Sequence, residues 1–372
     1  MKFAIEKAVL LKTLGHVQNI VERRNTVPVL SNVRIEADAN GISFKATDMD
    51  TEITEVVDAK ILENGAITAP AHMMYDIVRK LSDGAEVELV YPDEKEQLSI
   101  VSGRSKFSLP TIGIADFPAI SADSLPTNFS MKREELKDVI DRTQFAASTE
   151  ETRYFLNGLY IHPKDEGETK VLRIVATDGH RLACVETPLP AGAEGMQGVI
   201  LPRKTVAEIR KLLDDSNTES VQIALSDSKV RFTLEDITLA SKLIDGTYPD
   251  YERVIPTSNN KILELSVRSL ATAVDRVSVV AEKTRAIKMI ANKNHVIVTT
   301  SSPDLGSAIE DVEANYDNES LEIGYNFRYL LDILAEIKGD TVRFSFSDSS
   351  SPSLIHDTSD AGAIYVLMPM RV

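Results

Sequence analysis

The stretch FAIEKAVLL at residues 3–11 decides how the chain is organised, because its pattern returns twice. FSMKREELK at residues 129–137 and LELSVRSLA at residues 263–271 repeat the order of an apolar strand that runs directly into a helix. The copies lie roughly 130 residues apart, which is the length of a domain and too long for a solenoid repeat. We therefore expect three similar domains in tandem, at residues 1–125, 126–256 and 257–372.

A later block recurs with the same period and predicts a second helix in each domain. Ala69-Pro70, Leu201-Pro202 and Gly324-Tyr325 are each followed by apolar residues at helical spacing. Short alternating runs between the helices, such as residues 33–37 and 230–234, are typical of strands with one buried face. This order favours an α+β fold with mainly antiparallel sheets. The predicted helices lie at about 6–14, 72–81, 132–143, 203–213, 267–277 and 326–338.

Pro-, Ser- and Asn-rich segments at residues 118–126 and 255–261 are typical of linkers between domains. Cys184 is the only cysteine of the 372 residues, which excludes an internal disulfide and a cysteine-based zinc site. No run approaches the 18 or so apolar residues of a membrane span, and the N-terminus lacks the apolar block of a signal peptide. We expect a cytoplasmic protein that does not contact a membrane.

The formal net charge of -16 argues against binding to nucleic acid. The six predicted helices nevertheless carry 16 Lys and Arg residues against 10 Asp and Glu residues. Two interpretations fit this distribution. Either one helical surface is basic within an acidic protein, or the helices simply carry mixed charges toward solvent.

The usual enzyme motifs are missing, including phosphate-binding loops, dinucleotide fingerprints and nucleophile elbows. Asp48, Asp50 and Glu52 could bind a hard cation such as magnesium. However, Ala-Thr-Asp at residues 46–48 aligns with Ala-Thr-Asp at residues 176–178. A shared Asp at a strand end favours a turn that the Asp caps through the backbone, rather than a metal site.

Asp178 and His180 could form a carboxylate-oriented general base, with Ser148 or Thr177 as a nucleophile. The alternative is a polar turn whose His180 and Arg181 donate hydrogen bonds, which is the commoner role of such residues. That alternative is compatible with ligand binding.

The chain ends in an apolar strand, IYVLMPM at residues 364–370. Pro369 cannot continue a central sheet ladder, so Met368, Pro369 and Met370 are expected to stay partly exposed. Because methionine adapts to varied apolar surfaces, this segment suits a docking groove for several partners.

Together these residues resemble the bacterial sliding clamps, the β subunits of the replicative DNA polymerase. The resemblance covers the whole chain, and its most specific blocks are TVPVL at 26–30, RYFLNG at 153–158, ATDGHRL at 176–182, PDYERV at 249–254 and MPMR at 368–371. It implies a ring-shaped head-to-tail homodimer of six domains, with helices lining the inner surface and antiparallel sheets outside.

The resemblance implies a non-catalytic processivity factor without cofactor or metal, which encircles double-stranded DNA without reading its sequence. It further implies that a short linear motif docks the DNA polymerase III α subunit, the clamp loader δ subunit, other DNA polymerases and repair proteins. The implied peptide-binding residues are Arg153, Leu156, Thr177, Gly179, His180, Arg181, Leu182, Pro249, Arg253, Val254, Asn326, Tyr329, Val366, Leu367, Met368, Pro369, Met370 and Arg371.

The resemblance also implies contacts with DNA and with a second subunit. His72 occupies a position where the family often has arginine, and Ser350-Ser351-Pro352 at the groove edge departs from a more apolar pattern. The implied DNA-binding residues are Arg24, His72, Arg203 and Lys204. The implied dimer-interface residues are Arg104, Lys106 and Phe107, for which the alternative is a solvated strand with Phe107 in the core.

Two other functions compete with the clamp. One is a hydrolase that uses Asp178 and His180, and the other is a peptide-binding scaffold that never touches DNA. Replacement of His180 would abolish turnover in the hydrolase, and reversal of the charges at Arg24, Arg203 and Lys204 would leave the scaffold unaffected.

Overall fold

The computed structural model of the whole chain describes residues 1–92, 96–118, 120, 124–167, 169–281 and 285–371. Part of the predicted linker, at residues 119 and 121–123, and the last residue, Val372, lie outside these ranges. The chain forms two compact units. The first contains Met1–Glu134, Pro190–Gly195 and Ala207–Leu243, and the second contains Glu135–Leu189, Met196–Val206 and Ile244–Val372.

Each of the six α-helices in the described residues begins directly after a strand, as the repeated strand–helix pattern predicts. The junctions are β1 (Lys2–Glu6) with α1 (Lys7–Ile20), β6 (Gly65–Pro70) with α2 (Ala71–Arg79), β10 (Thr127–Lys132) with α3 (Arg133–Gln144), β14 (Val199–Pro202) with α4 (Arg203–Asp215), β18 (Lys261–Ser266) with α5 (Val267–Ala281), and β22 (Leu321–Asn326) with α6 (Phe327–Ala335).

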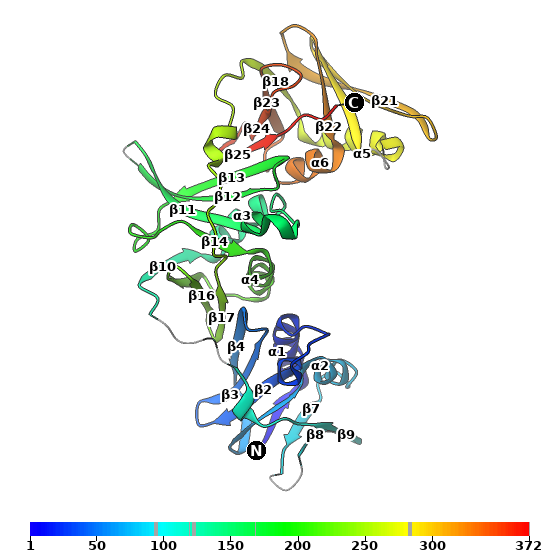
Figure 1. Cartoon of the computed structure of the whole chain (residues 1–372). Coiled ribbons are helices and arrows are strands. Elements are labelled where there is room, and N and C mark those ends of the chain that lie inside the picture. The colour runs from blue at the N-terminus through cyan, green and yellow to red at the C-terminus, as the bar shows by residue number, and fades with distance from the viewer. Residues whose placement is uncertain (93–95, 119, 121–123, 168, 282–284, 372) are drawn as a thin grey trace. The chain divides into compact units, whose positions relative to one another are not determined.

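Helix α1 runs six residues past its predicted end at residue 14. Gly15 weakens the local preference for a helix, but Val17 and Ile20 beyond it are fully buried. Gly15 also faces the Tyr75 ring of α2, which would lie 3.7 Å from an added Cβ atom. The packing of α1 on α2 therefore outweighs the local cost of the glycine (Figure 1).

The first unit contains two antiparallel sheets. β4 and β17 come from the first and the second sequence repeat, yet they pair directly, with Ile53 opposite Leu239. The sheets therefore do not follow the repeats. The five-stranded sheet has the order β5 (Lys60–Glu63), β1, β7 (Glu86–Val90), β8 (Gln97–Ser102) and β9 (Ser105–Pro110). The eight-stranded sheet has the order β10, β15 (Ser220–Leu225), β16 (Lys229–Leu234), β17 (Ile237–Lys242), β4 (Thr51–Val57), β3 (Gly41–Thr47), β2 (Asn32–Asp38) and β6.

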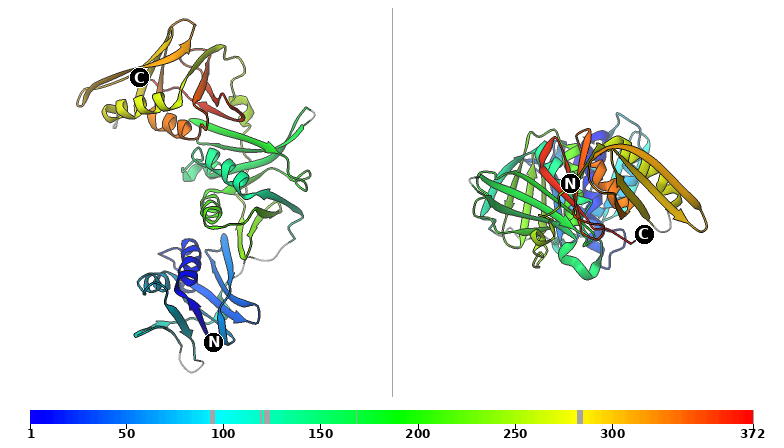
Figure 2. Two further views of the ribbon diagram at one scale, coloured as in Figure 1. Left: turned by 180° about the vertical axis from the view of Figure 1, so that it is seen from behind. Right: turned by 90° about the horizontal axis from the view of Figure 1, so that it is seen from above.

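The second unit is built on one twelve-stranded antiparallel sheet. Helix α5 packs against β20 and β21 and lies beside α6 (Figure 2). The sheet order is β14, β11 (Gly158–Glu166), β12 (Thr169–Thr177), β13 (Arg181–Pro188), β25 (Asp360–Leu367), β24 (Ser353–Asp357), β23 (Thr341–Phe346), β18, β21 (Gly306–Tyr316), β20 (His295–Ser302), β19 (Ala286–Asn292) and β22.

The predicted α+β class with antiparallel sheets is confirmed, since every strand pair of the three sheets is antiparallel. The predicted linker at 255–261 has neither helix nor strand from 255 to 260, whereas Lys261 begins β18 and is not part of a linker. Within the described ranges, no helix is long and apolar enough to span a membrane.

A carboxyl group with a raised pKa lies at the C-terminal end of α6. Glu336 caps this helix, and its backbone N–H donates to the Ile333 carbonyl at 3.1 Å. Burial, and then the charge of Asp141, raise the pKa of Glu336 to about 7. The folded protein therefore holds a proton here that the unfolded chain releases near the ordinary carboxyl range.

We predict that Glu336→Gln increases stability at alkaline pH. Because the folded pKa is about 7 and the ordinary value is 4.5, Glu336 makes the free energy of unfolding fall as pH rises between these values. The glutamine does not ionise, so the variant should gain about 1 kcal/mol at pH 8 and little at pH 4. Thermal unfolding at both pH values measures this. Exposed Glu219→Gln is the control, and an equal gain in both variants would contradict the prediction.

Candidate functional site

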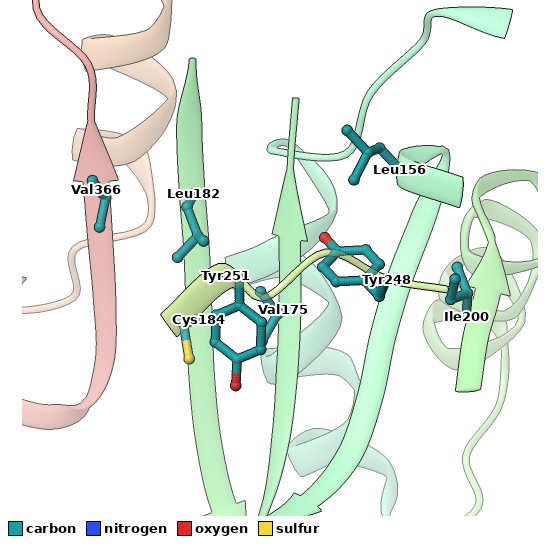
Figure 3. Close-up of a cluster of buried hydrophobic side chains, with 8 residues drawn as sticks. All are labelled: Leu156, Val175, Leu182, Cys184, Ile200, Tyr248, Tyr251 and Val366. Atoms are coloured by element: carbon teal, nitrogen blue, oxygen red, sulfur yellow. The ribbon is translucent and has the colours of Figure 1, made fainter. Parts of the chain in front are cut away.

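We assign the floor of the candidate groove to a buried apolar cluster in the second unit, because three predicted groove residues belong to it. It lies where β12, β13, β14 and β25 meet the chain segment that precedes residue 255 (Figure 3). Three predicted peptide-binding residues, Leu156, Leu182 and Val366, are only 5%, 2% and 2% exposed and belong to this floor. The full cluster is Leu156, Val175, Leu182, Cys184, Ile200, Tyr248, Tyr251 and Val366.

Tyr248 and Tyr251 are floor residues that the sequence reasoning missed. Tyr248 directly precedes the block at residues 249–254 and Tyr251 lies within it, and both are at least nine-tenths buried. The Tyr248 ring stacks on Tyr160 with centroids 4.7 Å apart. The sequence does contain a signal for them, because two tyrosines stand on either side of Pro249-Asp250.

One wall of the groove is a tight turn after β12. One carboxylate oxygen of Asp178, Oδ1, accepts the backbone N–H groups of His180 and Arg181 at 2.9 and 3.0 Å. The Thr177 hydroxyl donates to the Arg181 carbonyl at 2.6 Å and accepts from the Gly179 N–H at 3.1 Å. Gly179 has a φ of +88°, a conformation that favours glycine.

The first unit contains the same turn after β3. Asp48 Oδ1 accepts the N–H groups of Asp50 and Thr51 at 2.9 and 2.6 Å, and Met49 takes the positive φ, +79°. The prediction that Asp48 caps a turn is confirmed. Nowhere in the described ranges do three or more His, Cys, Asp or Glu side chains gather as a metal site would require.

The hydrolase arrangement is not formed around His180. Asp178 meets His180 through the backbone N–H, and its second oxygen accepts Arg181 Nε at 3.1 Å. The His180 ring instead stacks on Tyr329, with centroids 6.2 Å apart. The Ser148 side chain is buried and accepts the Glu150 N–H at 3.1 Å. The polar turn is therefore the right interpretation of this motif.

Arg181 is a fixed part of the wall rather than a mobile surface cation. Its guanidinium donates to Asp178 Oδ2, to Asp332 Oδ2 at 2.5 Å and to the Phe145 carbonyl at 2.5 Å. It also lies over the Tyr329 ring, 4.4 Å from the centroid. Only 9% of Arg181 is exposed, so it orients the aromatic wall and offers little free charge to a ligand.

The C-terminal strand lies directly beside this turn. The Met368 N–H donates to the His180 carbonyl at 2.9 Å, and the Met370 N–H donates to the Gly324 carbonyl at 2.9 Å. Leu367 is fully buried, whereas Met368 is 39% exposed and Pro369 is partly exposed. The predicted partial exposure of the terminal Met-Pro-Met segment is confirmed.

A hollow of about 680 Å³ adjoins the terminal Met-Pro-Met segment. Its rim includes the Lys288–Glu322 ion pair at 3.1 Å, which the sequence did not reveal. The lining residues are Lys288, Glu322, Ile323, Gly324, Ser349, Ser350, Pro369, Met370 and Arg371. Pro369, Met370 and Arg371 were predicted groove residues, and Ser350 belongs to the predicted edge.

The remaining predicted groove residues lie on the rim. A Cβ atom added at Gly179 would lie 3.0 Å from Arg153 Nη1. The Arg153 side chain is therefore in contact with the turn at Gly179. Pro249 is exposed, Arg253 pairs with Asp250 at 2.6 Å, and Val254 is 47% exposed. Asn326 caps α6 by accepting the Arg328 N–H at 3.1 Å.

The predicted DNA-binding residues are divided between the units. Arg24 is exposed after the end of α1, and His72 Nε2 donates to the Val21 carbonyl at 2.9 Å in the first unit. In the second unit, exposed Arg203 and half-buried Lys204 begin α4. With the observed bounds, the six helices carry 13 Lys and Arg against 10 Asp and Glu, so the predicted basic excess is smaller than expected.

Two predicted dimer residues, Lys106 and Phe107, lie on β9 at the edge of the five-stranded sheet, and Arg104 lies in the turn just before it. β9 pairs only with β8 in that sheet, and Arg104, Lys106 and Phe107 are exposed, Phe107 by 37%. Phe107 is therefore not a core residue. In the second unit, residues 306–313 of β21 pair with β20 alone, while residues 314–316 pair with β18. This second edge carries Ile309, which is 70% exposed and which the sequence reasoning missed.

Comparison with known proteins covers the chain from end to end. Models of the N-terminal, central and C-terminal domains of the DNA polymerase III β subunit match residues 1–121, 130–250 and 252–371. The β sliding clamp of Caulobacter vibrioides is 50% identical over 373 residues, and that of Pseudomonas aeruginosa is 37% identical over 374; both alignments span 100% of each chain.

Solved structures of sliding clamps are equally similar. A C. crescentus β sliding clamp has a TM-score of 0.97 at 50% identity, over 100% of this chain and 99% of the other. A Bartonella birtlesii sliding clamp bound to griselimycin has a TM-score of 0.97 at 45% identity over 100% of both chains. This chain belongs to the DNA polymerase III β subunit family, the β sliding clamps, which are non-catalytic processivity factors of DNA replication.

Proposed function

We propose that two copies of this chain close head to tail into a ring around duplex DNA in the bacterial cytoplasm. The full-length likeness to solved sliding clamps, at a TM-score of 0.97, is the observation that carries this proposal. A topological link lets the ring slide over phosphates without strong binding or base recognition. The ring then tethers DNA polymerase to its template.

The two open strand edges support a head-to-tail contact. β9 and the turn before it offer basic Lys106 and Arg104 beside Phe107, whereas β21 offers exposed acidic Asp311 and Glu313 beside Ile309. An exposed edge can pair with another chain through its backbone, and here the charges are complementary. Because the two edges differ, the contact is heterologous, and two copies close it when the rotation is suitable.

We propose that Arg24, His72, Arg203 and Lys204 face the DNA. Arg24 and Arg203 are exposed and keep a positive charge at every physiological pH. The hydrogen bond from His72 to the end of α1 holds its ring beside the segment that leads to Arg24. These residues contact phosphates, which makes binding independent of sequence.

We propose that the groove takes short linear peptides with apolar anchors, from the polymerase α subunit, the clamp loader δ subunit, other polymerases and repair proteins. Its buried apolar floor and its few fixed polar groups match what peptide recognition requires. The B. birtlesii clamp binds griselimycin, and the C. crescentus clamp holds polyethylene glycol at a putative β-motif tethering region. Griselimycin is therefore a probe for the groove of this chain.

The topological link predicts how the protein leaves DNA. Protein loaded onto nicked circular DNA by a cell extract should stay on intact circles and be lost after one cut. Changing Arg24, Arg203 and Lys204 together to Glu should lower loading by about tenfold, because like charges repel phosphates. The control is Lys293→Glu, on the exposed β19–β20 turn. Retention that ignores the cut and falls with salt would contradict the ring.

The strand-edge contact predicts that Phe107→Glu weakens the dimer. The glutamate would carry a negative charge into an apolar contact that faces acidic β21, and we expect the dimer dissociation constant to rise by at least about tenfold. Sedimentation equilibrium measures it. Leu62→Glu is a matched control, because Leu62 is 50% exposed on β5, the opposite edge of the same sheet. A dimer weakened equally by both changes would argue against β9 as the interface.

The geometry of the turn predicts that Gly179→Ala weakens griselimycin binding. An added Cβ would strain the positive φ and lie 3.0 Å from Arg153 Nη1, so both groove residues would shift. We expect about a tenfold loss of affinity by calorimetry and about 1 kcal/mol less stability. Gly84→Ala is the control, because Gly84 also has positive φ but no neighbour within 4 Å. Unchanged binding in Gly179→Ala would exclude this turn from the site.

A further inference from the structure

A buried arginine lies beneath the short 3₁₀-helix η4 (Tyr251–Val254), which carries part of the groove rim. Arg173 projects from β12 and is only 9% exposed. Its Nη1 donates to Glu252 Oε1 at 2.8 Å and to the Tyr251 hydroxyl at 3.2 Å. Its Nε and Nη2 donate to Glu186 Oε1 at 2.8 and 2.5 Å. One guanidinium therefore joins η4 to the sheet.

The remaining contacts of η4 strengthen this attachment. Glu186 stands opposite Arg173 on neighbouring β13, so it holds the guanidinium at the sheet surface. Lys164 of β11 donates to Glu252 at 2.5 Å, and this bond, more than the charge of Arg173, holds the pKa of Glu252 below its ordinary range. Lys164 and Arg173 thus bond η4 directly, and Glu186 supports it through Arg173. These three side chains come from three neighbouring strands.

His162 completes the network as a neutral acceptor. Its Nδ1 donates to the Pro163 carbonyl at 2.9 Å, since a carbonyl can only accept. Nε2 therefore accepts from the Tyr251 hydroxyl at 2.8 Å, and the hydroxyl oxygen stays free to accept from Arg173. Burial, and then the charge of Arg173, hold the pKa of His162 below its ordinary value.

We propose that Arg173 and His162 are positioning residues of the groove, which hold η4 so that Arg253 and Val254 face a bound peptide. This role rests on the proposed peptide-binding function. Neither Arg173 nor His162 needs to touch the ligand. A well-packed apolar side chain could replace a buried arginine with little loss of stability. It could not form the directed bonds that fix η4 against the sheet, so affinity would suffer more than stability.

The same network makes the groove sensitive to acid. When His162 gains a proton, Nε2 becomes a donor toward a hydroxyl that already accepts from Arg173, and a positive charge arises beside Arg173 and Lys164. The other ionisable groups that face this site are Glu186, Glu252, the Tyr251 hydroxyl, Tyr160, which stacks on His162, and Cys184. The opposed donors loosen η4 as pH falls below the ordinary histidine range.

Griselimycin affinity measured at pH 7.5 and 5.5 tests both residues. Arg173→Met should raise the dissociation constant about tenfold at pH 7.5. Arg343→Met is the matched control: Arg343 bonds Glu264 twice between β23 and β18, which carry no predicted groove residue. If Arg173→Met fails to fold, Glu252→Gln removes one anchor from the exposed side and should cost about threefold.

His162→Gln separates positioning from simple structural support. Glutamine keeps an acceptor for the Tyr251 hydroxyl but does not titrate, so the loss of affinity from pH 7.5 to 5.5 should disappear in this variant. If His162→Gln has the same pH profile as the unchanged chain, the loss of affinity at low pH is assigned to exposed His180, and the role of His162 is overturned. Full affinity in Arg173→Met would overturn the role of Arg173 alone. No binding by the unchanged chain would overturn the groove itself.

Discussion

The proposed groove depends above all on the backbone pairing of β13 with β25, which joins the middle of the chain to its last strand. Leu182 stands opposite Val366, and Arg181 opposite Leu367. Antiparallel neighbours place their side chains on the same face of a sheet, so both strands contribute to one apolar floor. The ladder then continues as the bond between the Met368 N–H and the His180 carbonyl. A one-residue slip would turn Leu182 and Val366 away from the floor.

The same Thr-Asp turn occurs twice in the chain, in two different surroundings. At Asp48 and at Asp178 the same carboxylate and hydroxyl bonds close the turn. The second turn differs in its surroundings, because Arg181 fixes an aromatic wall beside it and the apolar floor lies below. Its glycine at the positive-φ position also allows close approach of Arg153. The two turns therefore differ in their neighbours rather than in their own hydrogen bonds.

Buried arginines carry much of the organisation that surrounds the groove. Arg181 and Arg173 are each 9% exposed and each bonded to two carboxylates. Desolvation makes such ions costly unless every donor is matched, so their partners are strongly constrained. For the same reason a count of Lys and Arg along the chain says little about charge toward DNA. Arg173 and Arg181 are included in such a count, although carboxylates within the protein neutralise their charge.

The sequence by itself determined the six strand–helix junctions, the antiparallel α+β class and the capped turns, because these depend on local periodicity and on side chains bonding to nearby backbone. The family also followed from ordered blocks such as residues 176–182. Tertiary structure alone decided that β4 pairs with β17 and that β13 pairs with β25. It also decided that α1 continues past Gly15, that Arg173 bonds the Tyr251 hydroxyl, and that Ile309 is exposed on a strand edge. These features arise from contacts between residues far apart in the chain, which periodicity and spacing do not encode.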